Sequence, residues 1–206
     1  MRGRVKKRSS PQRREEIVQA ALRVVARHGA AGLSVARVAR QVGLSPSAIY
    51  RHYAGMDAVL SAVLDFIEAR LHGHIADVRD RSAGAFDQLH ELLRRHVRLI
   101  RENEAIPQIV FSEQIYSGKP KHRARLQRLI QGYLEWVGDL IREGQAIGEI
   151  RVDVAPQTAA MMFLGLIQPA AVFWHISEGR FDVTGSAERG WDIYRRGLTP
   201  PAEGGE

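Results

Sequence analysis

Residues 33–60 read LSVARVARQVGLSPSAIYRHYAGMDAVL, and this stretch decides the fold of the N-terminal part of the chain. Ser34 is placed to cap a first helix, in which apolar residues recur at the spacing of one helical face. Gly43 can end that helix, because glycine readily adopts the left-handed conformation found at helix C-termini. Ser45 can cap a second helix with Pro46 at its first position, where a missing N–H costs nothing. The stretch therefore predicts two helices separated by about three residues.

Two helices joined by a short glycine-containing turn are the signature of a helix-turn-helix, whose second helix enters the major groove of DNA. Ile49 and Tyr53 share one face of the second predicted helix, so we expect Tyr53 to belong to the core. Ser47, Tyr50 and Arg51 point away from that face. The pattern thus predicts a DNA-binding head that presents polar side chains on the outer face of its second helix.

The same stretch resembles the DNA-binding domain of the TetR family of bacterial transcriptional regulators, over roughly residues 11–71. The residues that carry the resemblance are Leu33-Ser34-Val35, Val38-Ala39, Val42-Gly43-Leu44-Ser45, Ile49-Tyr50-Arg51-His52-Tyr53, Asp57 and Leu60. One departure is Met56, because the family usually has a lysine there that touches a DNA phosphate.

The resemblance implies an all-α fold, with an N-terminal three-helix helix-turn-helix DNA-binding domain followed by a C-terminal helical ligand-binding and dimerisation domain. The hydrophobic pattern agrees, since helical stripes continue to Leu198 without a convincing strand. We expect a basic arm, a helix-turn-helix domain, a connecting helix, and an effector-binding and dimerisation domain at residues 1–10, 11–55, 56–72 and 73–206. The connecting helix is expected to end near Gly73.

The positive charge of the chain is concentrated at its N-terminus. The net charge is +7, and residues 1–14 contain seven basic and no acidic residues, which leaves 23 of each in the remainder. Such a segment is either a solubilising tail or an arm that contacts DNA. Beside the predicted helix-turn-helix we favour the arm, with contacts expected from Arg4, Lys6, Lys7 and Arg8.

Composition gives no support to an enzyme or to a bound cofactor. The 206 residues include no cysteine, so neither a disulfide framework nor a thiolate zinc site can form. No nucleophile elbow, phosphate-binding loop or dinucleotide fingerprint is present. His90-Glu91 has Arg94 where a zinc protease needs its second histidine, and His72 and His74 lack a third ligand nearby. The basic N-terminus has no apolar core of a secretory signal, so we expect a cytoplasmic protein.

The two predicted helices can present a definite set of polar side chains to DNA. The expected contacts are Ser34, Arg37, Ser45, Ser47, Tyr50, Arg51 and His52. In the resembled family, the positions of Tyr50 and His52 more often touch the DNA backbone, while residues near Ser47 reach bases. Arg51 could read a guanine through its planar guanidinium.

Residues 159–174 are apolar on every face and are interrupted only by Gly165, Gln168 and Pro169. A membrane span would need about 20 such residues, so this stretch is short and contains a proline. A helix apolar all round is otherwise buried on several sides, which a second subunit would achieve here. The resembled family dimerises through its last two helices. The expected interface residues are Met162, Phe163, Leu166, Ala170, Trp191 and Tyr194.

Aromatic and methionine residues on the inner stripes of the C-terminal part are either plain core or the wall of an effector cavity, which the resembled family typically has. The expected ligand-binding residues are Phe66, Phe111, Tyr116, Tyr133, Trp136, Met161, Gln168 and Trp174. A mostly apolar cavity suits an apolar or aromatic small molecule.

These features predict a homodimeric transcriptional regulator, acting as a repressor, that such an effector releases from a near-palindromic double-stranded operator. The alternative is a DNA-bound interaction protein whose C-terminal domain docks a protein partner. A closed cavity with polar groups in its wall would favour the effector-released repressor. A solid core with an exposed apolar patch would favour the interaction protein.

Overall fold

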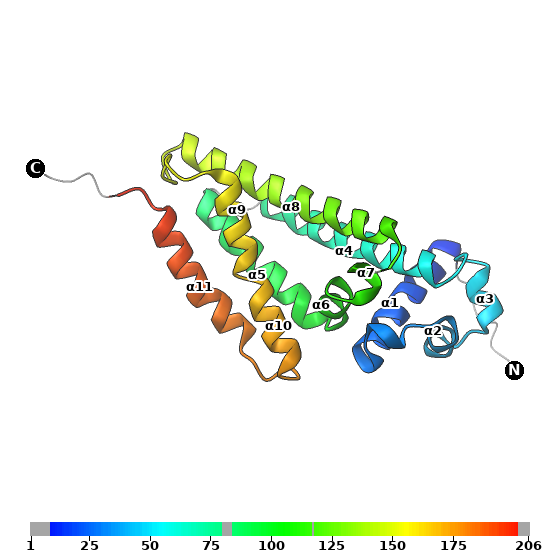
Figure 1. Ribbon diagram of the computed structural model, residues 1–206. Helices are drawn as coiled ribbons and strands as arrows, with labels where there is room; N and C mark the ends of the chain where they lie inside the picture. Colours follow the sequence, from blue (N-terminus) through cyan, green and yellow to red (C-terminus); the bar gives the residue numbers. More distant parts are fainter. Residues whose placement is uncertain (1–8, 80–83, 117, 202–206) are drawn as a thin grey trace, which may run out of the picture.

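Every regular element is a helix in the computed structural model, which describes residues 9–79, 84–116 and 118–201 (Figure 1). No strand occurs within these ranges, so the all-α prediction is confirmed. The elements in chain order are α1 (Ser10–His28), η1 (Ala30–Gly32), α2 (Val35–Val42), α3 (Pro46–Tyr50), α4 (Met56–Arg79), α5 (Ala85–Glu102), α6 (Ala105–Val110), α7 (Glu113–Tyr116), α8 (Pro120–Ala146), α9 (Pro156–Gly165), α10 (Gln168–Ile176) and α11 (Val183–Leu198).

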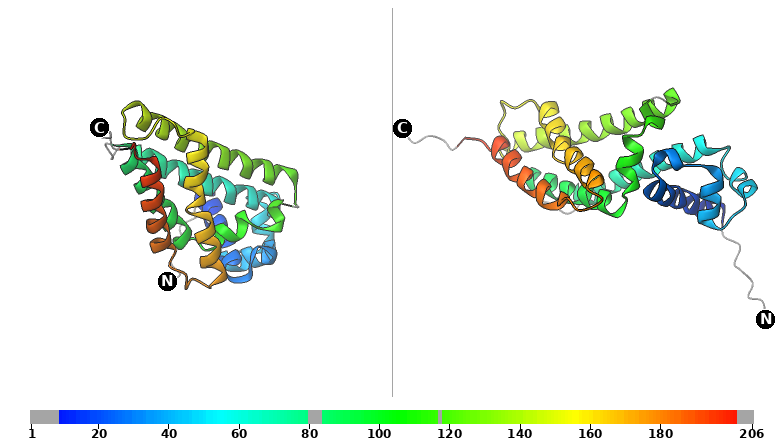
Figure 2. Two further views of the ribbon diagram at one scale, coloured as in Figure 1. Left: turned by 60° about the vertical axis from the view of Figure 1, so that its left-hand side comes forward. Right: turned by 60° about the horizontal axis from the view of Figure 1, so that its bottom comes forward.

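The first three helices form one end of an elongated molecule, and α9 to α11 lie toward the other end (Figures 1 and 2). Helix α1 begins at Ser10, where Pro11 occupies the first turn, and its apolar stripe packs on α2 and α4. Ile17, Val25, Val38 and Ile49 are fully buried where these helices meet. Their core is continuous with that of the C-terminal domain, because α1 also packs on α6.

Helix α4 connects the two ends of the molecule and is longer than the sequence predicted. It passes through Gly73 and ends at Arg79. A glycine inside a helix costs about 1 kcal/mol relative to alanine. Leu71 and Val78, on either side of Gly73, are both buried, and burying two such side chains gains several times that amount. Tertiary packing thus overrides the local stop signal.

Helix α8 runs beside α4 in the same direction (Figure 1). Ion pairs join their corresponding ends, from Asp57 with Lys119 near the N-termini to Arg79 with Glu143 at 2.7 Å near the C-termini. Helices α5 and α9 pack against α8, and α11 packs against α5 and α10. The C-terminal domain is therefore a helical bundle in which α4 and α8 form one long side.

The apolar stretch from 159 to 174 forms two helices, α9 and α10, with a break at Leu166 and Ile167. Pro169 lies in the first turn of α10, where its missing N–H removes no helical hydrogen bond. Residues 156–176 are long and apolar enough to span a bilayer by length and composition alone, which is weak evidence because core helices share these properties. The inner face of this stretch packs on α8, α6 and α11, and its outer face is exposed.

Candidate nucleic-acid interface and internal cavity

Local signals in the sequence build the helix-turn-helix as predicted. The Ser34 hydroxyl accepts a hydrogen bond from the Arg37 backbone N–H and caps α2. Gly43 ends α2 in the left-handed region, at a φ of 74°, and the Leu44 N–H donates to the Ala39 carbonyl at 2.8 Å. A residue with a Cβ would be strained at that φ. These contacts set the angle at which α3 leaves α2.

Helix α3 presents a polar surface to solvent. The Ser45 hydroxyl caps the helix by accepting from the Ala48 N–H, and it also bonds the Ser47 hydroxyl at 2.9 Å. The Tyr50 side chain is 57% exposed, and Arg51 follows it on the surface. These four polar side chains therefore stand on one accessible end of the molecule, where a DNA groove can reach them.

Tyr53 lies in the core beneath this surface, as predicted. It is 5% exposed, and its hydroxyl donates to the Arg14 carbonyl at 3.2 Å. The Arg14 guanidinium lies over its ring at 4.5 Å from the centroid, so charge attraction adds to packing. Tyr53 thereby ties the end of α3 to α1.

The other residues expected at the DNA interface differ in how exposed they are and in what they contact. The Arg37 guanidinium donates to the Gly32 carbonyl at 2.7 Å but stays on the surface. His52 is half-buried, and within the described residues its Nδ1 atom is buried without a partner. Met56, at the position of the usual lysine, packs partly against the core. Arg4, Lys6, Lys7 and Arg8 lie outside the described residues, so the arm remains a prediction.

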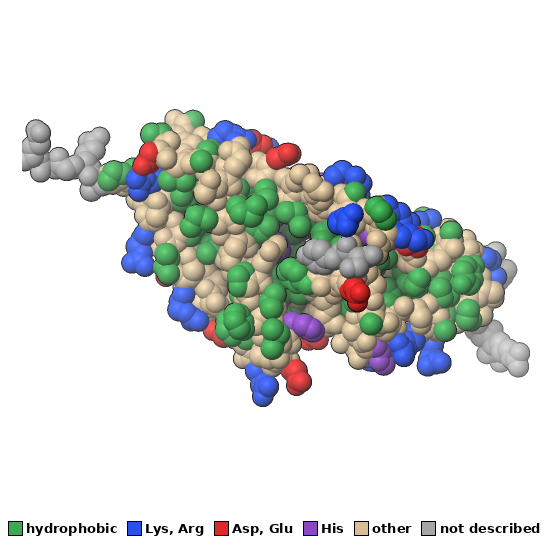
Figure 3. Space-filling view, viewed as in Figure 1, with side chains coloured by type: hydrophobic (Ala, Val, Ile, Leu, Met, Phe, Trp, Pro, Cys, Tyr) green, Lys and Arg blue, Asp and Glu red, His purple; other side chains and the backbone are tan. Residues whose placement is uncertain are grey.

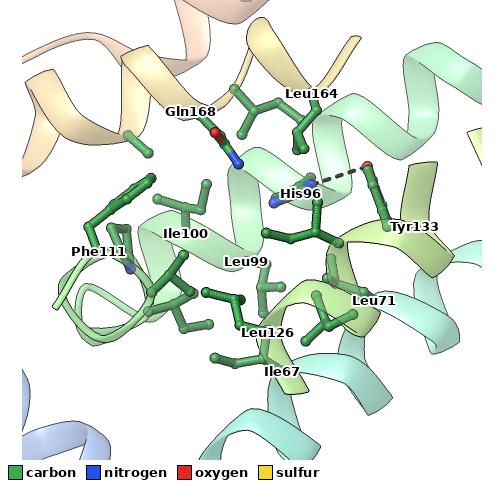
Figure 4. A pocket seen from close by; sticks show the side chains of 17 residues that line it. Ile67, Leu71, His96, Leu99, Ile100, Phe111, Leu126, Tyr133, Leu164 and Gln168 are labelled. Atoms are coloured by element: carbon green, nitrogen blue, oxygen red, sulfur yellow. Dashed lines mark hydrogen bonds between the residues drawn. The ribbon is translucent and has the colours of Figure 1, made fainter. Parts of the chain in front are cut away.

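A cavity lies inside the C-terminal domain, between α4, α5, α6, α8 and the α9–α10 pair (Figure 4). Its volume is about 660 Å³, which includes the open space at its mouth. Fourteen of its 17 lining residues are apolar, and the other three are His96, Tyr133 and Gln168.

The polar residues lie together on one side of the cavity. His96 Nδ1 and the Tyr133 hydroxyl are 3.1 Å apart, and Figure 4 shows the Gln168 side chain reaching into the same space. Burial lowers the pKa of His96 to about 4, with a smaller effect from His74, so its ring is neutral at neutral pH. Burial also raises the pKa of Tyr133 far above its ordinary value. The cavity thus offers uncharged hydrogen-bonding groups in an apolar wall.

Of the predicted ligand-binding residues, Phe111, Tyr133 and Gln168 line the cavity. The others lie elsewhere. Phe66 stacks under Arg70 at 5.1 Å, Trp136 lines a separate groove with His72, and Met161 is 57% exposed. Trp174 is buried near the end of α10, and its backbone carbonyl accepts a hydrogen bond from the Gly179 N–H. The side chain of Tyr116 is not among those described.

Sequence reasoning missed His96, although it lies on α5 between the buried residues Leu92, Leu93 and Ile100. A histidine among the apolar positions of a helix was the available signal. The other missed wall residues are aliphatic, and they cannot be told from core by pattern alone: Ile67, Leu71, Leu99, Ile100, Ile106, Pro107, Val110, Leu126, Leu129, Ile130, Leu164, Ile167 and Ala171.

The expected interface residues divide between two faces of α9 to α11. Met162 is 61% exposed and Leu166 is half-buried. The other four are buried within the single chain, so their side chains pack inside the subunit, which corrects the expectation: Phe163, Ala170, Trp191 and Tyr194. Exposed apolar side chains gather on the outer face of these helices (Figure 3): Met161, Met162, Phe173, Ile176 and Ile193.

His90, considered above for a zinc motif, makes structural contacts. Its Nε2 atom lies 2.6 Å from a Glu188 carboxylate oxygen, and its ring stacks on Trp191 at 4.8 Å. Arg94 pairs with the same carboxylate. These contacts join α5 to α11.

An exposed reading helix on a three-helix head, joined to a helical domain with an internal cavity, defines a helix-turn-helix DNA-binding regulator. A family model described as "Bacterial regulatory proteins, tetR family" matches residues 17–63. A second, "Tetracyclin repressor-like, C-terminal domain", matches residues 82–198, which is more than half of the chain. The chain therefore belongs to the TetR family of bacterial transcriptional regulators, as its sequence indicated.

Similar proteins extend over almost the whole chain. Nucleoid occlusion factor SlmA of Vibrio vulnificus (strain YJ016) is 23% identical over 182 residues, which cover 88% of this chain and 93% of SlmA. The structure of FadR from Bacillus subtilis in complex with stearoyl-CoA is 20% identical, with a TM-score of 0.77, and covers 89% of this chain and 98% of its own. The structure of a regulator from Saccharomonospora viridis in complex with choline is 19% identical, with a TM-score of 0.81. The match covers 93% of this chain and 100% of the S. viridis chain. At these identities the structures show a shared fold.

Proposed function

We propose that this regulator is a cytoplasmic homodimeric repressor that a small apolar or aromatic effector releases from DNA. The observation that carries the proposal is the internal cavity with three polar groups in its wall, because a solid core would offer an effector no site. SlmA is described as a nucleoid occlusion factor, and a protein-docking role is the alternative. The cavity with polar groups in its wall supports sensing, and we assign the exposed apolar face of α9 to α11, which docking would also use, to the dimer.

The lining of the cavity limits the chemistry of the effector. None of the 17 lining residues is acidic, lysine or arginine, and His96 is neutral, so a charge placed inside would have no partner. The part of the effector that enters is therefore uncharged and mostly apolar. A hydroxyl or carbonyl group on it can bond to His96, Tyr133 or Gln168, since a neutral imidazole offers one donor and one acceptor.

The exposed apolar face of α9 to α11 supports the homodimer. Met161 and Met162 on α9, and Phe173 and Ile176 on α10, are all more than half exposed. On α11, Gly190 is close enough to Leu166 that an added Cβ would lie 3.2 Å from the leucine. A two-fold axis through this face gives two reading heads, and hence a near-palindromic operator with half-sites about one DNA turn, or a multiple, apart.

Arg51→Ala is expected to lower operator affinity by about 1–3 kcal/mol and to relax the base preference at one position, because a guanidinium reads a base edge. Tyr50→Phe should weaken binding to all sequences about equally, since a phosphate contact carries no sequence information. The measurement is sequencing of DNA selected by each purified variant, followed by titration of the selected sites. An exchange of the two results would mean that α3 meets DNA with a different face.

An effector that releases the repressor must bind the DNA-free protein better than the operator complex, and by linkage the operator must weaken effector binding by the same factor. Calorimetry of each candidate ligand with and without operator tests this, with stearoyl-CoA as the first probe and choline, whose permanent charge would have no partner in the cavity, as the expected non-binder. Equal affinities for every ligand that binds in the cavity would contradict sensing and leave DNA binding intact.

A further inference from the structure

The first turn of α8 is attached to the first turn of α4 through one carboxylate. Asp57 Oδ1 lies 2.8 Å from His122 Nε2, and Asp57 Oδ2 lies 2.8 Å from Lys119 Nζ and 2.7 Å from Lys121 Nζ. These bonds, that of Lys119 first, lower the pKa of Asp57 well below its ordinary range, so it remains ionised. His122 is 2% exposed, unlike the two lysines. We call these four side chains the Asp57 cluster.

The Asp57 cluster lies at the junction between the reading head and the cavity domain. Asp57 is the second residue of α4, and only a short turn separates it from the end of α3 at Tyr50. Its three partners come from the C-terminal domain, 62 to 65 residues later in the chain. Asp57 therefore links the start of α8 to the segment that supports α3, beside the packing of α1 on α6.

The cavity uses the same two helices. Along α8, His122 is followed at helical spacing by Leu126, Leu129 and Tyr133, which line the cavity. Along α4, Ile67 is ten residues after Asp57, about 15 Å along the helix axis, and it also lines the cavity. On α8 one face thus carries both the cavity wall and the Asp57 cluster, and on α4 the two lie about three helical turns apart.

We propose that Asp57 is a positioning residue, which fixes the reading head relative to the effector cavity by holding α4 to the start of α8. The proposal rests on the proposed function, because it supplies the connection through which an effector would move the heads. Separation of α4 and α8 by a ligand between Ile67 and Leu126 strains the cluster at their N-terminal ends. The pairs that hold the head in its DNA-binding position are then the ones released.

If Lys119 and Lys121 had a different role, Asp57→Asn would change the operator affinity in the opposite direction. If the lysines bound DNA phosphates, Asp57→Asn would free them, remove a negative charge near DNA and strengthen binding. If the cluster positions the head, the same change loosens the head and weakens operator binding by about tenfold, within the usual range of coupling between sites. The sign of the change in operator affinity therefore separates the two roles.

Pulsed electron paramagnetic resonance measures the position of the head without DNA or effector. The chain has no cysteine, so spin labels can be placed at Arg40→Cys on α2 and Gln131→Cys on α8, both exposed. Labelled chains are diluted with unlabelled protein, which leaves only distances within one chain. Asp57→Asn should make the distance distribution about twofold broader, because a released head samples more positions.

Two further variants complete the experiment. Lys119→Gln with Lys121→Gln removes exposed side chains and leaves α4 untouched, and it should broaden the distribution as Asp57→Asn does. Glu143→Gln breaks the exposed pair with Arg79, which joins the same helices at their far ends, and it should change nothing. Circular dichroism checks that each variant is folded.

Unchanged distances in Asp57→Asn or in the double lysine variant would overturn the proposal, as would tighter operator binding by Asp57→Asn. These distances are measured without DNA, so they stand whether or not an operator is found. A wild-type protein that selects no DNA would instead overturn the proposed function. The two failures are therefore distinguishable.

Discussion

Replacing Met162 with glutamate is expected to convert the dimer into monomers that bind the operator weakly. Met162 is 61% exposed on α9, so the change should leave the single subunit intact. In the proposed dimer the carboxylate would be buried without a partner, at a cost of about 3–5 kcal/mol. This corresponds to dimerisation weakened roughly 100-fold to several thousand-fold. Analytical ultracentrifugation over a range of concentrations measures the change.

Ile147→Glu is the matched control, because Ile147 is similarly exposed, at 66%, but lies just after the end of α8. It should dimerise as the wild type does. Leu166→Glu would be a less clean variant, since Leu166 is half-buried and packs near Gly190 within the subunit. A Met162→Glu protein that stays dimeric at wild-type concentrations would show that this face is not the interface.

Phe163→Ala is expected to destabilise the subunit itself by about 3–5 kcal/mol, the usual cost of removing a buried phenylalanine. Phe163 follows Met162 directly in the chain but is fully buried, with the Tyr194 ring centroid 5.9 Å away. The free energy of unfolding should be measured by denaturant titration in the Met162→Glu background, where dimerisation adds nothing.

Gln157→Ala is the companion variant, because Gln157 lies exposed on the same helix. Its effect should stay within about 0.5 kcal/mol, as for most surface substitutions. A cost of less than about 1 kcal/mol for Phe163→Ala, well below the usual core value, would contradict its role in the core of the subunit.

The helix-turn-helix was predictable because its signals are local. Ser34, Gly43, Ser45 and Pro46 act through caps and backbone preferences that involve neighbours within a few residues. Tyr53 was assigned to the core correctly from its spacing with Ile49. Where a stop signal competed with burial, as at Gly73 in α4, the local prediction was wrong.

The orientation of α9 to α11 was not predictable from periodicity. A stretch that is apolar on every face has no polar side to mark its outside, so Met162 and Phe163 looked alike. The cavity was only partly predictable for a similar reason, since aliphatic wall residues such as Leu99 and Ile100 have the pattern of ordinary core. The Asp57 cluster joins residues more than 60 positions apart, a distance at which sequence spacing carries no information.

The parallel course of α4 and α8 has a consequence for how relatives of this chain can diverge. Each inserted residue turns the rest of a helix by about 100° and moves it by 1.5 Å. One insertion between Asp57 and Ile67 would turn these two side chains by about 100° relative to each other, so that one of them would lose its present partners. Substitutions in the cavity wall do not change the directions in which these side chains point around the helix. Ligand preference can therefore change while the segments 57–67 and 122–126 keep their lengths. Among homologues, we expect gaps to be rare in these two segments even where the cavity residues themselves vary.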